Sequence, residues 1–183
     1  MRGALFAALI AMAGAAAAET PLPFEVGGSF TLIDHHGQPR GEVDPDGRPQ
    51  LLFFGYANCP GICSAAFPMM ADVTADLARE GVALRPVMIT VDPERDTLEN
   101  MEEILTSWHP EFVGLTGDHT ALDTAYKAFS VEHSLAYEDP EYGPVYTHGS
   151  FVYLLDPQGA VLTLIPPILD APRVSGIVRG YLK

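Results

Sequence analysis

Cysteine is scarce in this chain of 183 residues, which contains only Cys59 and Cys63. Two cysteines four positions apart cannot supply the framework of several disulfides that holds many small exported domains together. A bridge between them would close a short loop and remove little conformational entropy from the unfolded chain. A local pair of this kind is more typical of redox chemistry or of metal binding.

Basic residues are also few. The chain has 10 Lys and Arg against 24 Asp and Glu, which gives a formal net charge of −14 at pH 7. Such a charge excludes nucleic acid as a partner held through its phosphates, and it disfavours anionic lipid surfaces. Basic proteins and cations remain possible partners.

The N-terminal stretch "MRGALFAALIAMAGAAAAET" has an apolar run over residues 4–13, which is too short for a membrane-spanning helix of about 20 residues. Arg2 precedes this run and a tract of alanines follows it, as in a secretory signal peptide. We expect residues 1–18 to be cleaved and residues 19–183 to form one domain that is exported, in a bacterium to the periplasm. An uncleaved N-terminal anchor is the alternative. Cleavage removes Arg2 and no acidic residue, so the mature chain is still more negatively charged. Anionic lipid head groups repel such a chain, and we expect no stable insertion of the mature protein into a membrane.

The stretch "LLFFGYANCPGIC" places both cysteines directly after an apolar run at residues 51–56. This run predicts a buried central strand. From Ser64 onward, apolar residues recur at helical spacing until Gly81. The cysteines are therefore expected at a strand-to-helix junction, where backbone N–H groups favour thiolate over thiol.

Further elements follow in an order that indicates fold class. The sequence predicts a strand from Val82 to the Asp92-Pro93 turn, helices opening at Thr97 and Asp118, strands at residues 150–156 and 160–166, and a final helix in "APRVSGIVRGYL". An N-terminal β-hairpin with "HHGQ" at its turn precedes them. This order predicts an α/β protein with a thioredoxin-like fold and an N-terminal hairpin extension.

Thiolates select Cu(I), zinc or iron–sulfur clusters, and two sulfurs do not complete any such site, so a third ligand is sought among the six histidines. His148, in "YTHGSFVYLLDPQG", lies just before a core strand, at the loop that a thioredoxin-like fold brings over its cysteines. The other histidines are expected at exposed turns or helix ends: His35, His36, His109, His119 and His133. Met69 and Met70 are expected to fill the core.

The segments "FFGYANCPGIC", "ITVDPERDTLENM", "GLTGD" and "YTHGSFVYLLDPQG" resemble the SCO/SenC proteins, copper chaperones for the CuA centre of cytochrome c oxidase. The resemblance runs from about Phe24 to the C-terminus. It implies a site in which Cys59, Cys63 and His148 hold one copper ion as Cu(I) or Cu(II). The turn at Asp92–Asp96 also matches the family, but a capped turn held by Arg95 ion pairs is the preferred interpretation of these residues.

The chain departs from the family pattern at three positions beside the expected ligands. Gly61 and Thr147 stand where the family usually has acids, and Ser64 stands where it usually has proline. The loss of two carboxylates near the ion predicts a copper couple shifted toward Cu(I).

Two functions follow from these residues. A metallochaperone would carry copper to the CuA-bearing subunit of cytochrome c oxidase or to another exported copper protein. A thiol–disulfide oxidoreductase would instead use Cys59 and Cys63 as redox-active thiols to reduce the cysteines of such a protein, and would itself need a thiol reductant. His148 distinguishes the two, because metal transfer requires it and thiol exchange does not.

Overall fold

The computed structural model describes residue 22 and residues 24–182, so the expected signal peptide at residues 1–18 lies outside the described residues. The elements in chain order are β1 (Leu32–Asp34), β2 (Pro39–Arg40), β3 (Gln50–Gly55), α1 (Cys63–Arg79), β4 (Arg85–Thr90), α2 (Leu98–Trp108), β5 (Val113–Thr116), α3 (His119–Ala128), β6 (Ser134–Asp139), β7 (Gly143–Thr147), β8 (Val152–Leu155), β9 (Val161–Ile165) and α4 (Ala171–Tyr181).

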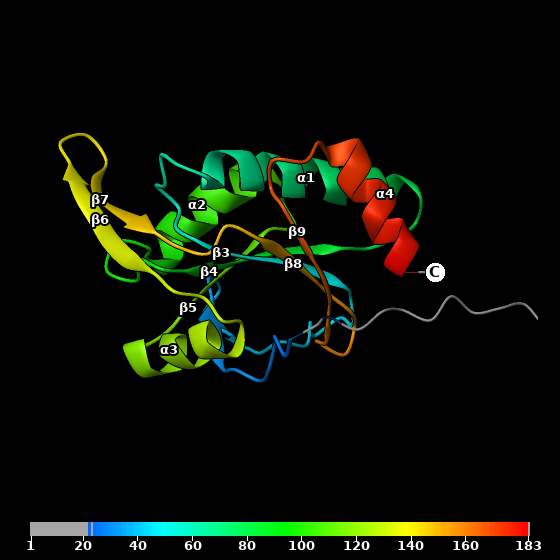
Figure 1. Cartoon of the computed structure of the whole chain (residues 1–183), viewed down its shortest axis with the longest axis horizontal. Coiled ribbons are helices and arrows are strands. Elements are labelled where there is room, and N and C mark those ends of the chain that lie inside the picture. The colour runs from blue at the N-terminus through cyan, green and yellow to red at the C-terminus, as the bar shows by residue number, and fades with distance from the viewer. Residues whose placement is uncertain (1–21, 23, 183) are drawn as a thin grey trace, which may run out of the picture.

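A seven-stranded mixed sheet in the order β2-β1-β5-β4-β3-β8-β9 forms the centre of the fold (Figure 1). β3, β4 and β5 are parallel, whereas β8 pairs antiparallel with β3 and β1 pairs antiparallel with β5. This is the thioredoxin-like α/β arrangement that the sequence predicts. The predicted N-terminal hairpin is present as β1 and β2, and it joins one edge of the sheet.

Two apolar layers cover the two faces of this sheet. Leu51 and Phe53 of β3 face a cluster that contains the buried sides of α1, α2 and α4, whereas Leu52 and Phe54 face the cluster on the α3 side. All six residues of β3 are buried, which explains why every residue after Gln50 is apolar. Met69 and Met70 are buried in α1, as predicted for core residues.

Two structural features were absent from the sequence-based prediction. β5 is a short central strand at "VGLT", and β6 with β7 forms a separate two-stranded antiparallel sheet. This second sheet, called here the histidine hairpin (β6 and β7), projects to the left of the body in Figure 1. The five residues from Ser134 to Glu138 are all exposed, so β6 lacks the apolar-polar alternation that announces a half-buried strand.

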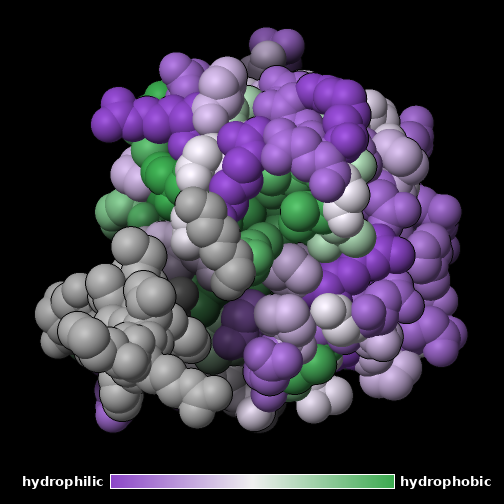
Figure 2. All heavy atoms as spheres, turned by 90° about the vertical axis from the view of Figure 1, so that its right-hand side faces the viewer, coloured by the Kyte–Doolittle hydropathy of each residue, from purple (hydrophilic) through white to green (hydrophobic). Residues whose placement is uncertain are grey.

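The surface seen in Figure 2 is largely hydrophilic. Figure 2 views the face at the right of Figure 1, where hydrophilic side chains surround an apolar area in the middle. Among the described residues, none of the helices combines the length and the hydropathy needed to cross a membrane.

Candidate metal centre

The end of β3 and the start of α1 position the two thiols. Cys63 is the first residue of α1, and Cys59 lies in the preceding cysteine loop (residues 56–62). The N–H of Cys59 donates to the Tyr56 carbonyl oxygen over 3.3 Å, which folds the loop back toward β3. Both cysteines are free thiols. Because Cys59 lies outside the helix, the two side chains are not held at the wide separation of residues four apart on one helix.

His148 comes from the short loop between β7 and β8. Its Nδ1 lies 3.0 Å from the carbonyl oxygen of Gly149. A carbonyl oxygen only accepts, so Nδ1 carries the proton and donates, and Nε2 keeps a free lone pair in the neutral ring. Nε2 lies 3.7 Å from Sγ of Cys63, so the lone pair is directed to the thiols.

The structure brings together the three residues selected from the sequence. The two Sγ atoms and one ring nitrogen of His148 all lie within 4.8 Å of one another. Donors bound at about 2.0–2.3 Å to one three-coordinate ion would stand about 4 Å apart. The site therefore accommodates one ion with small side-chain movements, and its two sulfurs and one imidazole form a donor set suited to a soft metal.

The two cysteines have opposite acidities. The hydrogen bond from Cys63, together with the backbone N–H groups of Cys63 and Gly61, lowers the pKa of Cys59 despite burial. Burial raises the pKa of Cys63, and the neighbouring Cys59 raises it further. The strand-to-helix junction was expected to favour thiolate, and its backbone N–H groups do contribute to the lowered pKa of Cys59, although the side chain of Cys63 contributes more. The expectation is wrong for Cys63, which is 1% exposed, because the cost of desolvating its thiolate outweighs the stabilisation by the N–H groups.

Aromatic rings enclose the inner side of the site. The rings of Phe53 and Tyr56 meet the His148 ring edge-to-face, with centroids 5.7 Å and 5.9 Å away. Sequence reasoning assigned these two aromatics only to a buried strand. Their positions as the third and the last residue of that apolar run gave no indication that they would contact a histidine so distant in the chain.

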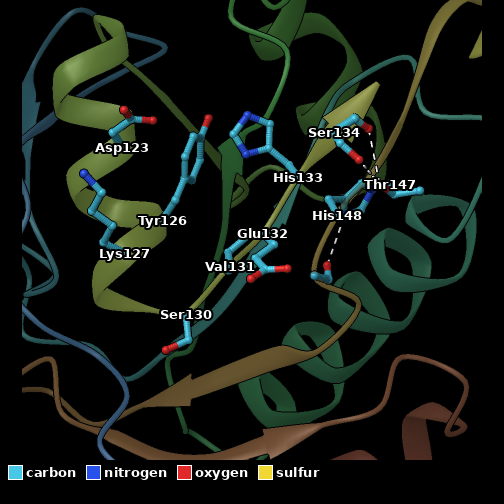
Figure 3. A pocket seen from close by; sticks show the side chains of 11 residues that line it. Asp123, Tyr126, Lys127, Ser130, Val131, Glu132, His133, Ser134, Thr147 and His148 are labelled. Atoms are coloured by element: carbon cyan, nitrogen blue, oxygen red, sulfur yellow. Dashed lines mark hydrogen bonds between the residues drawn. The ribbon is translucent and has the colours of Figure 1, made fainter. Parts of the chain in front are cut away.

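A cavity of about 710 Å³ opens beside His148, between α3 and the start of the histidine hairpin. Figure 3 shows that Asp123, Tyr126 and Lys127 of α3 line one side, whereas His133 and His148 line another. His133 is exposed, as predicted, and its ring lies 4.5 Å from that of Tyr126. His148 is therefore reachable from outside through this cavity.

The prediction that His35 is an exposed turn residue is wrong. His35 is 4% exposed, and its Nδ1 accepts a hydrogen bond from the N–H of Gly114 over 3.1 Å. Its Nε2 lies 3.1 Å from Nε2 of His36, which is exposed as predicted. Because the hairpin joins the main sheet at β5, its turn is packed against the body instead of projecting into solvent. His109 ends α2 and His119 opens α3 at an exposed position, as predicted.

The positions that depart from the family pattern lie around the thiols and the imidazole. A Cβ added to Gly61 would meet only Sγ of Cys59, at an ordinary 3.8 Å. The Thr147 hydroxyl lies 2.8 Å from that of Ser134 across the histidine hairpin (Figure 3). Ser64 donates to the Gly61 carbonyl oxygen over 2.7 Å and so closes the cysteine loop on the helix.

The turn at Asp92–Asp96 is held by the Arg95–Asp92 ion pair that the sequence suggested. The structure adds contacts that the sequence does not reveal. Asp96 is buried and accepts from the N–H of Ala57 in the cysteine loop, and Arg95 donates to carbonyl oxygens of the histidine hairpin.

Fold and site together define a class: a thioredoxin-like protein in which two thiols and an imidazole meet where one soft metal ion fits. Comparison with known protein families identifies the family within this class. The SCO1/SenC family profile matches residues 18–183, and the chain belongs to this family.

Relatives extend over most of the chain. It is 34% identical over 141 residues to a SCO2-like protein of Rickettsia conorii, covering 75% of this chain and 68% of the relative. It is 36% identical over 157 residues to the mitochondrial SCO2 homologue of Mus musculus, covering 85% of this chain and 62% of the relative.

Two solved structures agree in fold. Arabidopsis thaliana ScoI with copper bound has a TM-score of 0.77 at 28% identity, covering 84% of this chain and 96% of its own. Yeast Sco1 with copper bound has a TM-score of 0.74 at 29% identity, covering 86% of this chain and 91% of its own.

Proposed function

We propose that this protein is a metallochaperone that binds one copper ion through Cys59, Cys63 and His148 and delivers it to another protein. The observation that carries the proposal is the convergence of these three donors within 4.8 Å. Copper in the structures of the Arabidopsis and yeast relatives supports the choice of metal. The family resemblance supports the CuA-bearing subunit of cytochrome c oxidase as the recipient.

The copper is cargo, so the site must bind it and also release it. Two thiolates and one imidazole suit Cu(I), and a fourth coordinating group, from a recipient, could enter from the exposed side of the site. The low pKa of Cys59 keeps one sulfur deprotonated before the metal arrives. Metal binding would displace the proton of Cys63, because the thiolate is the ligand form.

A second function is favoured by the unequal thiols. The Cys59 thiolate would attack one sulfur of a target disulfide, forming a mixed disulfide and releasing one target thiolate. Cys63 would then attack Sγ of Cys59, which releases the second target thiolate and leaves a Cys59–Cys63 disulfide. Two electrons pass to the target, and an external thiol reductant must restore the pair.

Anaerobic titration of the reduced protein with Cu(I), in the presence of a competing chelator, tests the metallochaperone. The wild type should bind one equivalent, whereas Cys59→Ser and Cys63→Ser should each lose binding. His148→Ala should bind more weakly and lose Cu(II)–thiolate absorption, yet it should keep thiol–disulfide exchange. Unchanged binding in both serine variants would exclude this site, and full activity as a reductase without any copper binding would favour the second function.

We further propose that residues 1–18 are a signal peptide, that residues 19–183 form one domain, and that the mature protein works in an export compartment such as a bacterial periplasm. The alanine tract before Glu19 supports this proposal. Mass spectrometry of the protein secreted by its host tests it, with an N-terminus at Glu19 as the expected result.

A further inference from the structure

The two halves of the metal centre belong to different parts of the fold. The thiols follow β3 of the main sheet, whereas His148 follows the histidine hairpin, which forms its own two-stranded sheet. Among the described residues, three hydrogen bonds join this hairpin to the body. The N–H of Tyr146 donates to the Tyr56 hydroxyl over 3.4 Å, and Arg95 makes the other two.

Arg95 reaches the hairpin with both terminal nitrogens of its guanidinium group. Nη1 donates to the Tyr142 carbonyl oxygen, and Nη2 donates to that of Pro144 over 2.7 Å. Nε donates to the carboxylate of Asp92, which is 1% exposed and fixes the direction of the guanidinium. Gly143, between the two carbonyl groups, has φ +71°, and a Cβ there would come within 2.9 Å of Nη1. The hairpin backbone thus fits closely around the Arg95 side chain.

The next residue, Asp96, holds the other half of the centre. Its carboxylate is 2% exposed and accepts from the N–H of Ala57 over 3.2 Å and from the Thr90 hydroxyl over 2.6 Å. Ala57 is two residues before Cys59, in the cysteine loop. Two adjacent residues of one turn therefore contact both halves of the centre. Asp96 contacts the loop that carries the thiols, and Arg95 contacts the hairpin that precedes the histidine.

We infer that Arg95 is a positioning residue for the metal centre. It clamps the histidine hairpin so that the His148 imidazole stays within 4.8 Å of the two thiols, where all three donors can reach one ion. No hydrogen bond or ion pair joins Arg95 to the three donors, so it acts through the hairpin backbone. Its guanidinium carbon also lies 5.6 Å from the centroid of the Tyr56 ring, which packs against the His148 ring. The part of the inference that concerns copper rests on the proposed function, whereas the clamp itself exists without metal.

The chemistry of the contact requires arginine. A guanidinium group presents several N–H donors in a fixed planar fork, so it can serve two carbonyl oxygens and one carboxylate together. A lysine ammonium is a single point charge on a flexible stem and cannot span all three acceptors. Arg95→Lys should therefore keep the ion pair with Asp92 and lose part of the clamp, whereas Arg95→Met should lose all of it.

The first test measures amide hydrogen exchange in the copper-free protein. Arg95→Met should accelerate exchange in β6, β7 and the His148 loop by about tenfold or more, because charge-assisted hydrogen bonds are lost, and should leave β3 and β4 unchanged. The NMR signals of the His148 ring should shift or broaden in the same variant. Arg48→Met is the matched control, because the Arg48 side chain is 27% exposed against 26% for Arg95 and pairs with Asp46 and Glu111 at the opposite end of β3.

The second test measures Cu(I) affinity in a double-mutant cycle with His148→Ala. If Arg95 acts through His148, Arg95→Met should weaken binding by about tenfold in the wild-type background and hardly at all in the His148→Ala background. Arg95→Lys should fall between wild type and Arg95→Met. It also carries the test if Arg95→Met fails to fold.

Equal losses of affinity in the two backgrounds would show a general structural effect and would overturn the inference. Unchanged hydrogen exchange in the hairpin would overturn it without reference to copper. If the wild type bound no copper, the proposed function would fail, and hydrogen exchange with the His148 ring signals would still decide whether Arg95 is the clamp.

Discussion

Nε2 of His148 lies 3.7 Å from Sγ of Cys63, although 85 positions separate these residues in the sequence. The histidine hairpin and β8 bring the imidazole to the thiols, so the centre exists only in the folded chain. Its geometry therefore depends on contacts far from the donors. The cysteines alone form a local pair, and a donor set for a soft metal arises only when the third residue joins them.

The two thiols should react at very different rates. Cys59 is half-buried and has a lowered pKa, whereas Cys63 is buried and its pKa is raised by desolvation. Because the thiolate is the nucleophile, iodoacetamide should modify Cys59 first and largely spare Cys63 in the native protein. Mass spectrometry of peptides after partial alkylation measures the ratio. Faster labelling of Cys63 would contradict this order, and labelling in denaturant, where both should react alike, is the control.

His35 should contribute to stability although it lies at a turn. His35→Ala leaves the buried N–H of Gly114 without its acceptor, so we expect it to lower the free energy of unfolding by about 2–3 kcal/mol. His35→Asn keeps a side-chain acceptor and should recover part of the loss. His36→Ala, at the exposed neighbour, should change it by less than about 1 kcal/mol. Urea denaturation compares the three variants, and equal effects at both histidines would refute the structural role of His35.

The sequence predicted the parts of the fold that local patterns encode. The apolar run at residues 51–55 of β3 and the helices that open at Thr97 and Asp118 follow from short-range chemistry, and the structure has all three. The burial of His35 was not predictable in this way, because it depends on pairing between β1 and β5, about 80 residues apart.

The histidine hairpin escaped prediction for a related reason. β6 is exposed, β7 is largely half-buried, and a bulge between Leu135 and Tyr137 interrupts their pairing, so they show no regular alternation. The place of His148 was nevertheless predicted, because the core strand after it has a clear apolar pattern. What the sequence could not reveal was the support of that place by Arg95 and Asp96, since hydrogen bonds to backbone carbonyls and N–H groups leave no pattern in side-chain types.

The buried carboxyl of Asp96 should make stability depend on pH in an unusual direction. Burial raises its pKa from 3.8 to about 6. Between these values the native state binds more protons than the unfolded chain, so the free energy of unfolding contributed by this group falls as pH rises through that window. Above about pH 6 both states are ionised and the contribution is constant.

Asp96→Asn removes this titration. The difference in unfolding free energy between wild type and variant should therefore change by on the order of 2–3 kcal/mol between pH 4 and pH 7, with the wild type losing relative stability. Urea denaturation at several pH values measures the difference, from which the other carboxylates cancel. A constant difference across this range would mean that Asp96 titrates normally.

Gly61 offers the sharper of two sites for restoring a carboxylate beside the ion. The sequence alone favours Thr147→Asp as the cleaner change, because glycine can occupy backbone conformations that other residues avoid. The structure reverses this choice. An added Cβ at Gly61 has space and lies 3.8 Å from Sγ of Cys59, whereas Thr147 is hydrogen-bonded to Ser134 and its replacement disturbs the hairpin.

In copper-loaded protein, Gly61→Asp should lower the reduction potential and raise the affinity for Cu(II), because a nearby negative charge favours the more highly charged ion. An interaction on the order of 1 kcal/mol in a partly exposed site corresponds to about 40 mV in a one-electron couple, which redox titration resolves. Gly176→Asp is the control, since Gly176 lies in α4 and an added Cβ there meets nothing within 4 Å. The shift should shrink at high salt, because counterions screen exposed charges. A potential that stayed constant or rose in Gly61→Asp would place this position outside the electrostatic range of the ion.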